Sequence, residues 1–378
     1  MDNAPRPLNI LLFGDTSNFH NTLAKGLRRL GHDVTVASDG TGWMNTPRDI
    51  DLARGPGKAG GLWLWLRMRF LMRQRLSGYD VVAISGTHFA RLKPSRLRSI
   101  FDMVRRNNRR VFQTALATDT FFVEECLDPL SPLSYNEWRV GDLDTPYSRE
   151  KGQLAANWTS GALRDYCRHL AGNIDGAVTV LYEYHVSCHR ALPDHKIKYG
   201  GIPIDTEGIR FIPVDETPRQ VRLFLGYPSH RMLEKGAERL LAAARRVVME
   251  YPDRCTLDVA SDIPLDEFMK RLEASHVVID QLYSYTPATT ALMAMAMGKT
   301  VLSGGEEDFY KFIDETELRP VINLDPHDDE SIYRAIRDVV LHPELLAERG
   351  RKGRAFVERH NSAEVVARRF LDAWLSLG

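Results

Sequence analysis

The clearest strand–helix–strand unit in this sequence is residues 276–306, which read HVVIDQLYSYTPATTALMAMAMGKTVLSGGE. The apolar run at 276–280 predicts a buried strand, and the almost wholly apolar run at 287–297 predicts a buried helix. Gly298 ends that helix, and the residues at 300–302 predict the next strand. Strands joined in this way pair in parallel, so the unit predicts a parallel sheet that is covered on both faces.

The same alternation continues on both sides of this unit. In the second half we expect strands at 221–225, 255–260 and 320–323, and helices at 235–249, 265–273, 329–341 and onward to 377. In the first half we expect strands at 9–13, 34–37, 79–84, 111–116 and 176–180, and helices at 19–30, 96–106 and 155–169. The stretch 199–218 is rich in turn formers and predicts a linker.

The fold class is therefore α/β, with two Rossmann-like parallel-sheet domains that face a central cleft. We expect an N-terminal domain at 1–205, a C-terminal domain at 206–360, and a C-terminal helix at 361–378 that packs back on the first domain. The length of 378 residues also favours two domains, because single cores stop growing at about 250–300 residues.

The composition is that of a globular protein and excludes a disordered or fibrous chain, with 43% hydrophobic and 26% charged residues. The 50 basic and 50 acidic side chains cancel, which argues against a dedicated nucleic-acid binder. The charge is nevertheless uneven. Residues 1–200 hold 27 basic and 20 acidic side chains, whereas residues 201–378 hold 23 and 30.

We expect a cytoplasmic protein. The N-terminus lacks the basic and long apolar regions of a signal peptide, and no apolar run reaches the ~18 residues of a membrane span. The four cysteines are far apart in sequence, which indicates reduced, buried thiols.

A first candidate site follows the strand at 9–13, where Gly14, Asp15, Ser17 and His20 lie in a polar turn. Ligands of open α/β sheets bind outside the carboxyl ends of the strands, and a histidine there suits a general base. The turn lacks the G-x-G-x-x-G dinucleotide pattern. Capping of the next helix by Asp15, Ser17 or Asn18 is the alternative interpretation.

A second candidate site follows the strand at 221–225, where Arg231 lies just before the expected helix and Lys235 and Gly236 open it. Free backbone amides at a helix start attract phosphate, and the two cations add charge. Solvated surface charge is the alternative.

A third candidate site is the turn and helix start at 285–290. Thr286 followed by a proline predicts an N-cap, and the hydroxyls of Thr289 and Thr290 could hold a diphosphate. The next strand end brings Glu306, or its neighbour Glu307, to the same edge.

We expect no metal and no tightly bound cofactor. The sequence lacks a P-loop, the D-x-D triplets at 49–51 and 142–144 follow no clear strand, and His185, Cys188 and His189 offer three ligands without a fourth.

An aromatic and basic stretch has two interpretations. Residues 62–66 read LWLWL, and the arginines Arg67, Arg69, Arg73 and Arg75 follow. Such a segment could lie on an anionic membrane surface. An ordinary packing helix with extended arginine side chains is the other interpretation.

Taken together, these motifs resemble GT-B glycosyltransferases, in particular the family-4-like branch of bacterial polysaccharide gene clusters. The turn with His20 and the GHDVTV stretch at 31–36 look like the acceptor domain of that fold, and IPID at 202–205 looks like its linker. Arg231 and Lys235 look like its phosphate-binding cations, and AMAMGKTV at 294–301 looks like the helix and strand after the donor loop. The family's E-x7-E pair falls on Tyr285 and Met293, neither of which is acidic.

The resemblance implies a metal-independent transferase that moves a sugar from a nucleotide diphosphate sugar to a glycan or lipid-linked acceptor in polysaccharide assembly. Donor contacts would come from Arg231, Lys235, Gly236, Tyr285, Thr286, Thr289, Thr290 and Glu306. His20 and Asp119 would act on the acceptor hydroxyl, with Gly14, Asp15 and Ser17 beside them. A sugar-nucleotide epimerase of the same fold and a non-catalytic binding or scaffold protein stay open as alternatives. We expect no nucleic-acid partner and, if the basic stretch acts, peripheral contact at the inner face of an anionic membrane.

Overall fold

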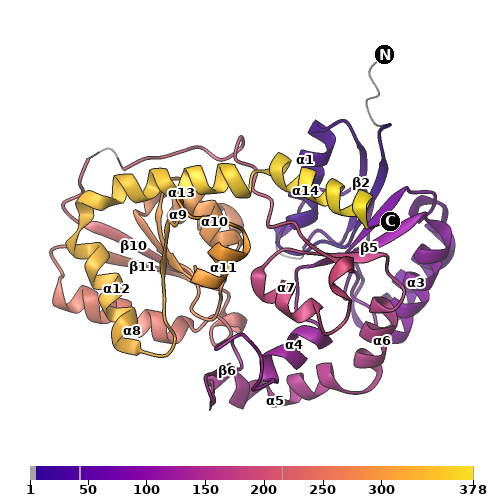
Figure 1. The fold of residues 1–378 in the computed structure, drawn as a ribbon, viewed down its shortest axis with the longest axis horizontal. Helices are drawn as coiled ribbons and strands as arrows, with labels where there is room; N and C mark the ends of the chain where they lie inside the picture. Colours follow the sequence, from indigo (N-terminus) through magenta and orange to yellow (C-terminus); the bar gives the residue numbers. More distant parts are fainter. Residues whose placement is uncertain (1–5, 42–43, 215, 378) are drawn as a thin grey trace. The chain divides into compact units, whose positions relative to one another are not determined.

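The computed structural model describes residues 6–41, 44–214 and 216–377, and these residues form two compact units (Figure 1). The first unit contains residues 1–125, 153–203 and 363–378, and the second contains residues 126–152 and 204–362. Each unit is built on one parallel sheet. The chain is therefore an α/β protein with two parallel sheets. The N-terminal segment was expected not to be a signal peptide. Residues 1–5 of that segment lie outside the described residues.

The described strands of the first sheet lie in the order β3-β2-β1-β4-β5-β8-β9. They are β1 (Asn9–Phe13), β2 (Asp33–Ser38), β3 (Ile50–Asp51), β4 (Val81–Ser85), β5 (Arg110–Ala115), β8 (Gly176–Thr179) and β9 (Ile197–Tyr199). Every pair is parallel, and β1 and β4 are almost fully buried, as expected for strands with helices on both faces. The five strands expected in this half are confirmed, and two short edge strands are added.

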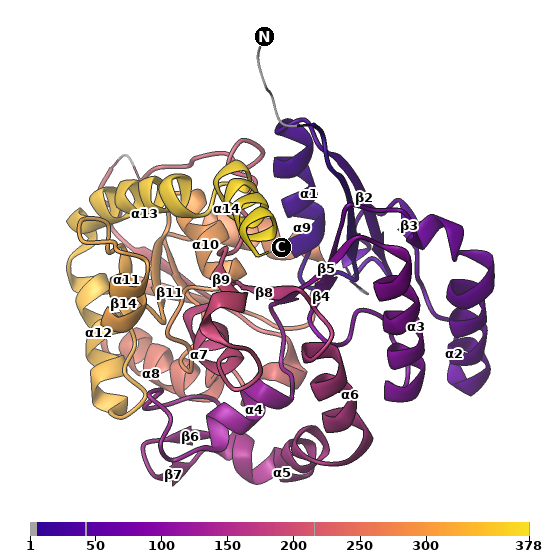
Figure 2. The same ribbon diagram turned by 45° about the vertical axis from the view of Figure 1, so that its right-hand side comes forward.

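Helices α1 (Phe19–Arg29), α2 (Gly57–Leu66), α3 (Pro94–Asn107), α4 (Thr120–Leu127), α5 (Pro146–Thr159), α6 (Gly161–Ala171) and α7 (Tyr182–Cys188) connect these strands. The last helix, α14 (Ala363–Ser376), lies against α1 (Figures 1 and 2). A Cβ built on Gly26 of α1 would lie 2.1 Å from the carbonyl oxygen of Ala363. The absence of a side chain there lets the two helices approach closely.

The described strands of the second sheet lie in the order β11-β10-β12-β13-β14. They are β10 (Val221–Gly226), β11 (Cys255–Ala260), β12 (Val277–Ile279), β13 (Thr300–Ser303) and β14 (Val321–Asn323), all in parallel pairs. These are the strands that the sequence predicted. Ile204, where the chain enters this unit, bridges to Ser362, where it leaves.

The second sheet is covered by α8 (Ala237–Glu250), α9 (Leu265–Ala274), α10 (Thr289–Ala296), α11 (Glu307–Phe312), α12 (Asp329–Leu341) and α13 (Leu346–His360). Helices α8 and α12 pack on each other, and each buries one apolar stripe (Figure 1). The start of α10 was predicted incorrectly. The helix begins at Thr289 with Ala288 at the N-cap position, so Thr286 lies outside it.

The segment 126–152 was expected in the first domain, but it packs within the second unit. It holds the short antiparallel hairpin of β6 (Arg139–Val140) and β7 (Leu143–Asp144). This part of the chain carried no strand or helix expectation. All four cysteines are buried, and none of them forms a disulfide bond.

Candidate functional site

Both sheets have a point at which the order of the strands reverses along the chain. In the second sheet, β10 lies between β11 and β12, and in the first, β1 lies between β2 and β4. At such a point, the helices that follow two neighbouring strands lie on opposite faces of the sheet. The loops at the carboxyl ends of those two strands therefore diverge. Ligands of open α/β sheets bind at this point. The candidate residues lie in the loops at these reversal points. Two of these loops follow β10 and β12, and the third follows β1.

The loops after β10 and β12 are in close contact with each other. Gly236 is at the N-cap position of α8 with φ +64°, which favours glycine. A Cβ on Gly236 would lie 2.9 Å from the Cβ of Leu282. The backbone N–H of Leu282 also donates to the carbonyl of Lys235 at 2.9 Å. The turn at Lys235 and Gly236 therefore packs directly on the loop after β12.

Lys235 is a buried ion-pair partner. Its Nζ lies 2.7 Å from Oδ1 of Asp280, and the side chains are 9% and 0% exposed. The other carboxylate oxygen of Asp280 is buried and has no hydrogen-bond partner among the described residues. The alternative of solvated surface charge is therefore wrong for Lys235, because its ammonium group is buried. The Asp280 carboxylate, rather than water, neutralises that charge.

Arg231 also lies beside a carboxylate. Its Nε and Nη2 donate to Oε1 of Glu234 at 3.0 and 2.5 Å. The Arg231 side chain is 41% exposed, so it can exchange this partner for a ligand at little desolvation cost. Of the two cations, Arg231 is therefore the more exposed to solvent.

The candidates around α10 differ in burial. Tyr285 and Thr286 are buried, whereas Thr289 and Thr290 are half-buried in the first turn of the helix. Within the described part of the chain, the Thr289 and Thr290 hydroxyls make no hydrogen bond. The first turn of a helix also carries amides without intrahelical acceptors. These groups can bind an anion together.

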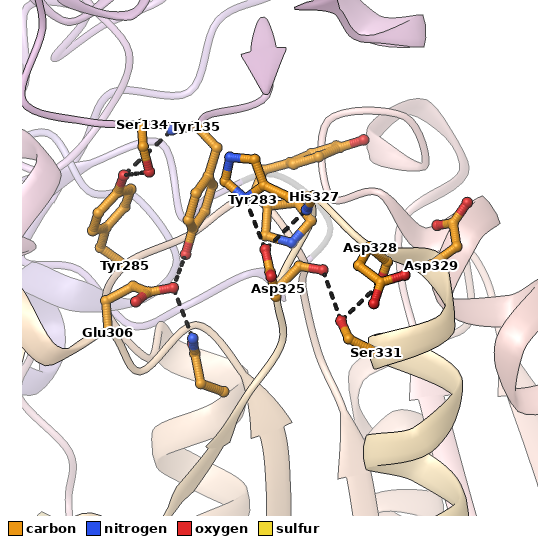
Figure 3. Close-up of polar contacts among 12 residues, drawn as sticks. Ser134, Tyr135, Tyr283, Tyr285, Glu306, Asp325, His327, Asp328, Asp329 and Ser331 are labelled. Atoms are coloured by element: carbon orange, nitrogen blue, oxygen red, sulfur yellow. Dashed lines mark hydrogen bonds and ion pairs between the residues drawn. The ribbon is translucent and has the colours of Figure 1, made fainter. Parts of the chain in front are cut away.

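Glu306 follows β13 and lies at the N-cap position of α11, and Figure 3 shows its side chain beside that of Tyr135. Its Oε1 accepts hydrogen bonds from the Tyr135 hydroxyl at 2.8 Å and from Nδ2 of Asn323 at 2.7 Å. A Cβ on the preceding Gly304 would lie 1.8 Å from the carbonyl oxygen of Ser284, so only glycine lets this turn pass so close to the β12 loop. Glu306 is therefore brought next to Tyr285.

Tyr135 belongs to the segment 126–152 and was not found by sequence reasoning. Its ring stacks on that of Tyr285 with a centroid distance of 4.6 Å and an interplanar angle of 19° (Figure 3). His327 meets the Tyr135 ring edge-on at 5.8 Å. No periodicity around position 135 connects it to residues 150 or more positions away, so the sequence held no signal for this contact.

In the first unit, Asp15 caps α1. Its Oδ1 accepts from the backbone N–H of His20 at 2.9 Å, while its other oxygen is buried without a hydrogen-bond partner in the described structure. Burial raises the pKa of Asp15 to about 7. Gly14 is buried beside it, and Ser17 is exposed with φ +53°. Thr16 and Ser85, at the ends of β1 and β4, share a hydrogen bond of 3.2 Å.

His20 is completely buried. Its ring nitrogens contact the carbonyl oxygen of Gly14 at 2.7 Å and the hydroxyl of Thr114 at 3.0 Å. Burial lowers the pKa of His20 to about 4, so the ring is neutral at neutral pH. A neutral ring has one N–H donor and one acceptor nitrogen, which matches a carbonyl on one side and a hydroxyl on the other. These contacts fix the β1 turn.

Asp119 lies after β5 and is buried. Its Oδ1 accepts from the N–H of Phe122 at 2.9 Å, which caps α4, and its Oδ2 accepts from Gln113 at 3.3 Å. Burial raises the pKa of Asp119 to about 6. The capping interpretation is confirmed. The raised pKa also lets this carboxyl exchange a proton near neutral pH.

The aromatic and basic stretch forms α2, the π-helical turn Arg67–Leu71 and the short helix Gln74–Leu76. Leu64 and Met68 are buried, whereas Trp63, Phe70 and Leu71 are 56%, 63% and 70% exposed. One side of the segment therefore packs and the other presents large apolar side chains. Among the residues that the structure describes, no helix has the length and apolar character needed to cross a membrane.

The described residues hold no group of three or more side chains suited to a metal ion. His185 contacts Thr179, and His189 contacts Asp194.

Comparison with solved structures shows the fold. Sucrose-phosphate synthase from Thermosynechococcus elongatus matches with a TM-score of 0.61 and 16% identity, covering 98% of this chain and 99% of that one. HepE of Anabaena in complex with UDP-glucose gives 0.58 and 12%, covering 97% and 99%. The UDP-GlcNAc 2-epimerase of Neisseria meningitidis bound to UDP-GlcNAc gives 0.51 and 11%, covering 97% and 99%. No family model and no curated protein matches the sequence.

The fold is therefore that of the GT-B glycosyltransferases and related UDP-sugar enzymes. At these identities the likeness concerns the fold, and it extends over nearly the full length of the neighbours. No sequence match supports the family-4-like assignment.

Proposed function

We propose that this protein is a glycosyltransferase that uses a nucleotide diphosphate sugar, with UDP as the first nucleotide to test. The strongest support for the proposal comes from the residues that lie where the strand order reverses, at the carboxyl ends of β10 and β12. Arg231 and Gly236 follow β10 and the half-buried start of α10 follows β12, at the edge where sheets of this class bind ligands. Solved proteins with this fold were crystallised with UDP-sugars.

The donor diphosphate would lie on the start of α10. The Thr289 and Thr290 hydroxyls and the first-turn amides would supply donors, and the partly exposed Arg231 would supply positive charge. Lys235 would act by holding Asp280 and the β12 loop in place. Fixed donors stabilise the charge that develops on the leaving phosphate, so the proposal requires no metal.

On the acceptor side, Asp119 is the candidate proton acceptor, because its raised pKa places its titration close to the working pH. His20 and Asp15 would shape the β1 turn with Gly14 and Ser17. The acceptor is proposed to be a glycan or a lipid-linked glycan.

Calorimetric titration with UDP tests the donor site. Wild-type protein should bind UDP, and Arg231→Ala should weaken binding about 10- to 100-fold, because a charge-assisted hydrogen bond contributes about 1.5–3 kcal/mol. Arg245→Ala, which removes an exposed arginine of α8, is the matched control. Equal affinity of wild type and Arg231→Ala would contradict the assignment.

An epimerase is the second candidate, because the first unit holds two carboxyl groups with raised pKa values, Asp15 and Asp119. An epimerase must both remove and return a proton, and two such groups could share that work. Incubation with UDP-GlcNAc without acceptor separates the candidates, because NMR would detect an epimer only in the second case. UDP binding without turnover in any assay would favour the non-catalytic alternative.

We propose further that the exposed apolar face of residues 62–71 docks on an anionic lipid surface. Residues 54–79 contain six basic and no acidic side chains, so charge and apolar exposure coincide. Sedimentation with vesicles containing an anionic lipid should capture wild-type protein, and Trp63→Ser with Phe70→Ser should abolish capture. Met249→Ser, at an exposed methionine of α8, is the control. Capture that survives the double substitution would refute the proposal.

A further inference from the structure

The inserted segment 126–152 contributes Tyr135 to the edge of the second sheet where the donor is proposed to bind. We propose that Tyr135 is a positioning residue that aims the Glu306 carboxylate at hydroxyl groups of the donor sugar. Glu306 would then provide, from the β13 turn, the carboxylate that is missing at Tyr285. This inference rests on the proposed function and deepens it.

The segment is held in one conformation by its own contacts. Asn136 accepts from the N–H groups of Trp138 and Arg139 at 2.8 and 3.1 Å and donates to the carbonyl of Cys126 at 3.1 Å. Trp138 is fully buried and meets the ring of Tyr147 at 4.8 Å. A side chain carried by such a network is suited to fixing another group in place.

Two tyrosines connect the segment to the β12 loop. The Tyr285 hydroxyl contacts Oγ of Ser134 at 3.0 Å and accepts from the N–H of Tyr135 at 3.3 Å. The Tyr135 hydroxyl lies 3.1 Å from the carbonyl oxygen of Ser284 and 2.8 Å from Oε1 of Glu306. The stacked rings therefore place the Tyr135 hydroxyl beside the Glu306 carboxylate.

One oxygen of Glu306 is occupied and the other is available. Oε1 takes the hydrogen bonds of Tyr135 and Asn323. Oε2 makes no hydrogen bond with the described residues, and the side chain is half-buried rather than enclosed. A carboxylate oriented through one oxygen presents the second as a fixed acceptor.

The chemistry of a carboxylate selects the part of the donor that it can bind. It repels the diphosphate but accepts hydrogen bonds from sugar hydroxyls. Tyr147 of the same segment is buried, which raises the pKa of its hydroxyl, and the charges of Glu234 and Arg231 are close enough to act on it. The segment 126–152 thus extends from the Arg231 loop to the Glu306 turn.

The test compares UDP with UDP-glucose and UDP-GlcNAc in calorimetric titrations. Tyr135→Phe keeps the stacked ring and removes the hydroxyl, so affinity for the preferred UDP-sugar should fall about 5- to 10-fold while affinity for UDP changes less than about twofold. Tyr333→Phe is the matched control, because it removes a tyrosine hydroxyl that donates to Glu250 between α12 and α8.

A double-mutant cycle that combines Tyr135→Phe with Glu306→Gln tests directly whether Tyr135 positions the Glu306 carboxylate. If Tyr135 acts through the carboxylate, Tyr135→Phe should cause less than about a twofold further loss of UDP-sugar affinity in the Glu306→Gln background. Equal losses for UDP and UDP-sugar, no loss for either, or a full additional loss in the double variant would overturn the inference and leave the donor site standing. Wild-type protein that binds UDP-sugars no better than UDP would also overturn it. Failure to bind any of the three ligands would overturn the proposed function and this inference together.

Discussion

Replacement of Lys235 by methionine should destabilise the second unit strongly. Methionine retains most of the apolar stem of lysine, so the change removes the ammonium with little change in volume. The Asp280 carboxylate, which is fully buried, then loses its only charged partner among the described residues. Removal of one member of a buried ion pair costs about 3–5 kcal/mol in the free energy of unfolding. For a unit of this size, that cost corresponds to a fall of about 10 °C in melting temperature.

Differential scanning calorimetry is the appropriate assay, because two units can unfold in separate transitions. The double variant Lys235→Met with Asp280→Leu should recover most of the lost stability, since two apolar side chains of similar volume need no compensating charge. A single variant that melts within about 2 °C of wild type would refute the account of a buried pair. A double variant that is less stable than the single variant would refute it as well.

Three further predictions concern other parts of the molecule. Burial raises the pKa of Asp15 to about 7, so wild-type protein should lose stability as the pH rises from about 4 to 7, where the unfolded chain gives up this proton and the folded protein keeps it. Asp15→Asn carries no such proton. In urea unfolding it should be more stable than wild type by about 2–4 kcal/mol at pH 8, and about equally stable at pH 4. Gly26→Ala should lower the stability of the first unit by about 2 kcal/mol or more in the same assay, because its Cβ would overlap the carbonyl of Ala363. Gly304→Ala should weaken UDP-sugar binding more than UDP binding in calorimetry, because its Cβ would displace the turn from Ser284.

The sheet of the second unit could be predicted strand by strand, because each strand is a short apolar run and turn or helix patterns separate it from the next. The strands at 221–225 and 255–260 were predicted to within one residue at either end. Helix α12 was predicted with its observed bounds, since Asp328 caps it and its apolar residues follow one stripe. Local patterns such as these are set by neighbouring residues and are visible in a single sequence.

Features that depend on distant residues could not be predicted in this way. The proline at 287 suggested a helix start two residues before the observed one at Thr289. The burial of Lys235 depends on Asp280, which lies 45 positions away. The stacking of Tyr135 on Tyr285 crosses 150 positions and joins a segment of the first half to the second unit. The Lys235–Asp280 and Tyr135–Tyr285 contacts are tertiary and leave no periodic signal in the sequence.

The central claim, that the donor binds at the carboxyl edge of the second sheet, is tested most directly by hydrogen exchange with and without UDP. Bound UDP should slow amide exchange in the loop and helix start at 227–238, in the β12 loop and first turn of α10 at 280–292, and in the β13 turn at 303–307, while the outer helix α12 stays unchanged. Slower exchange confined to the first unit, or no change anywhere at saturating UDP, would contradict the claim.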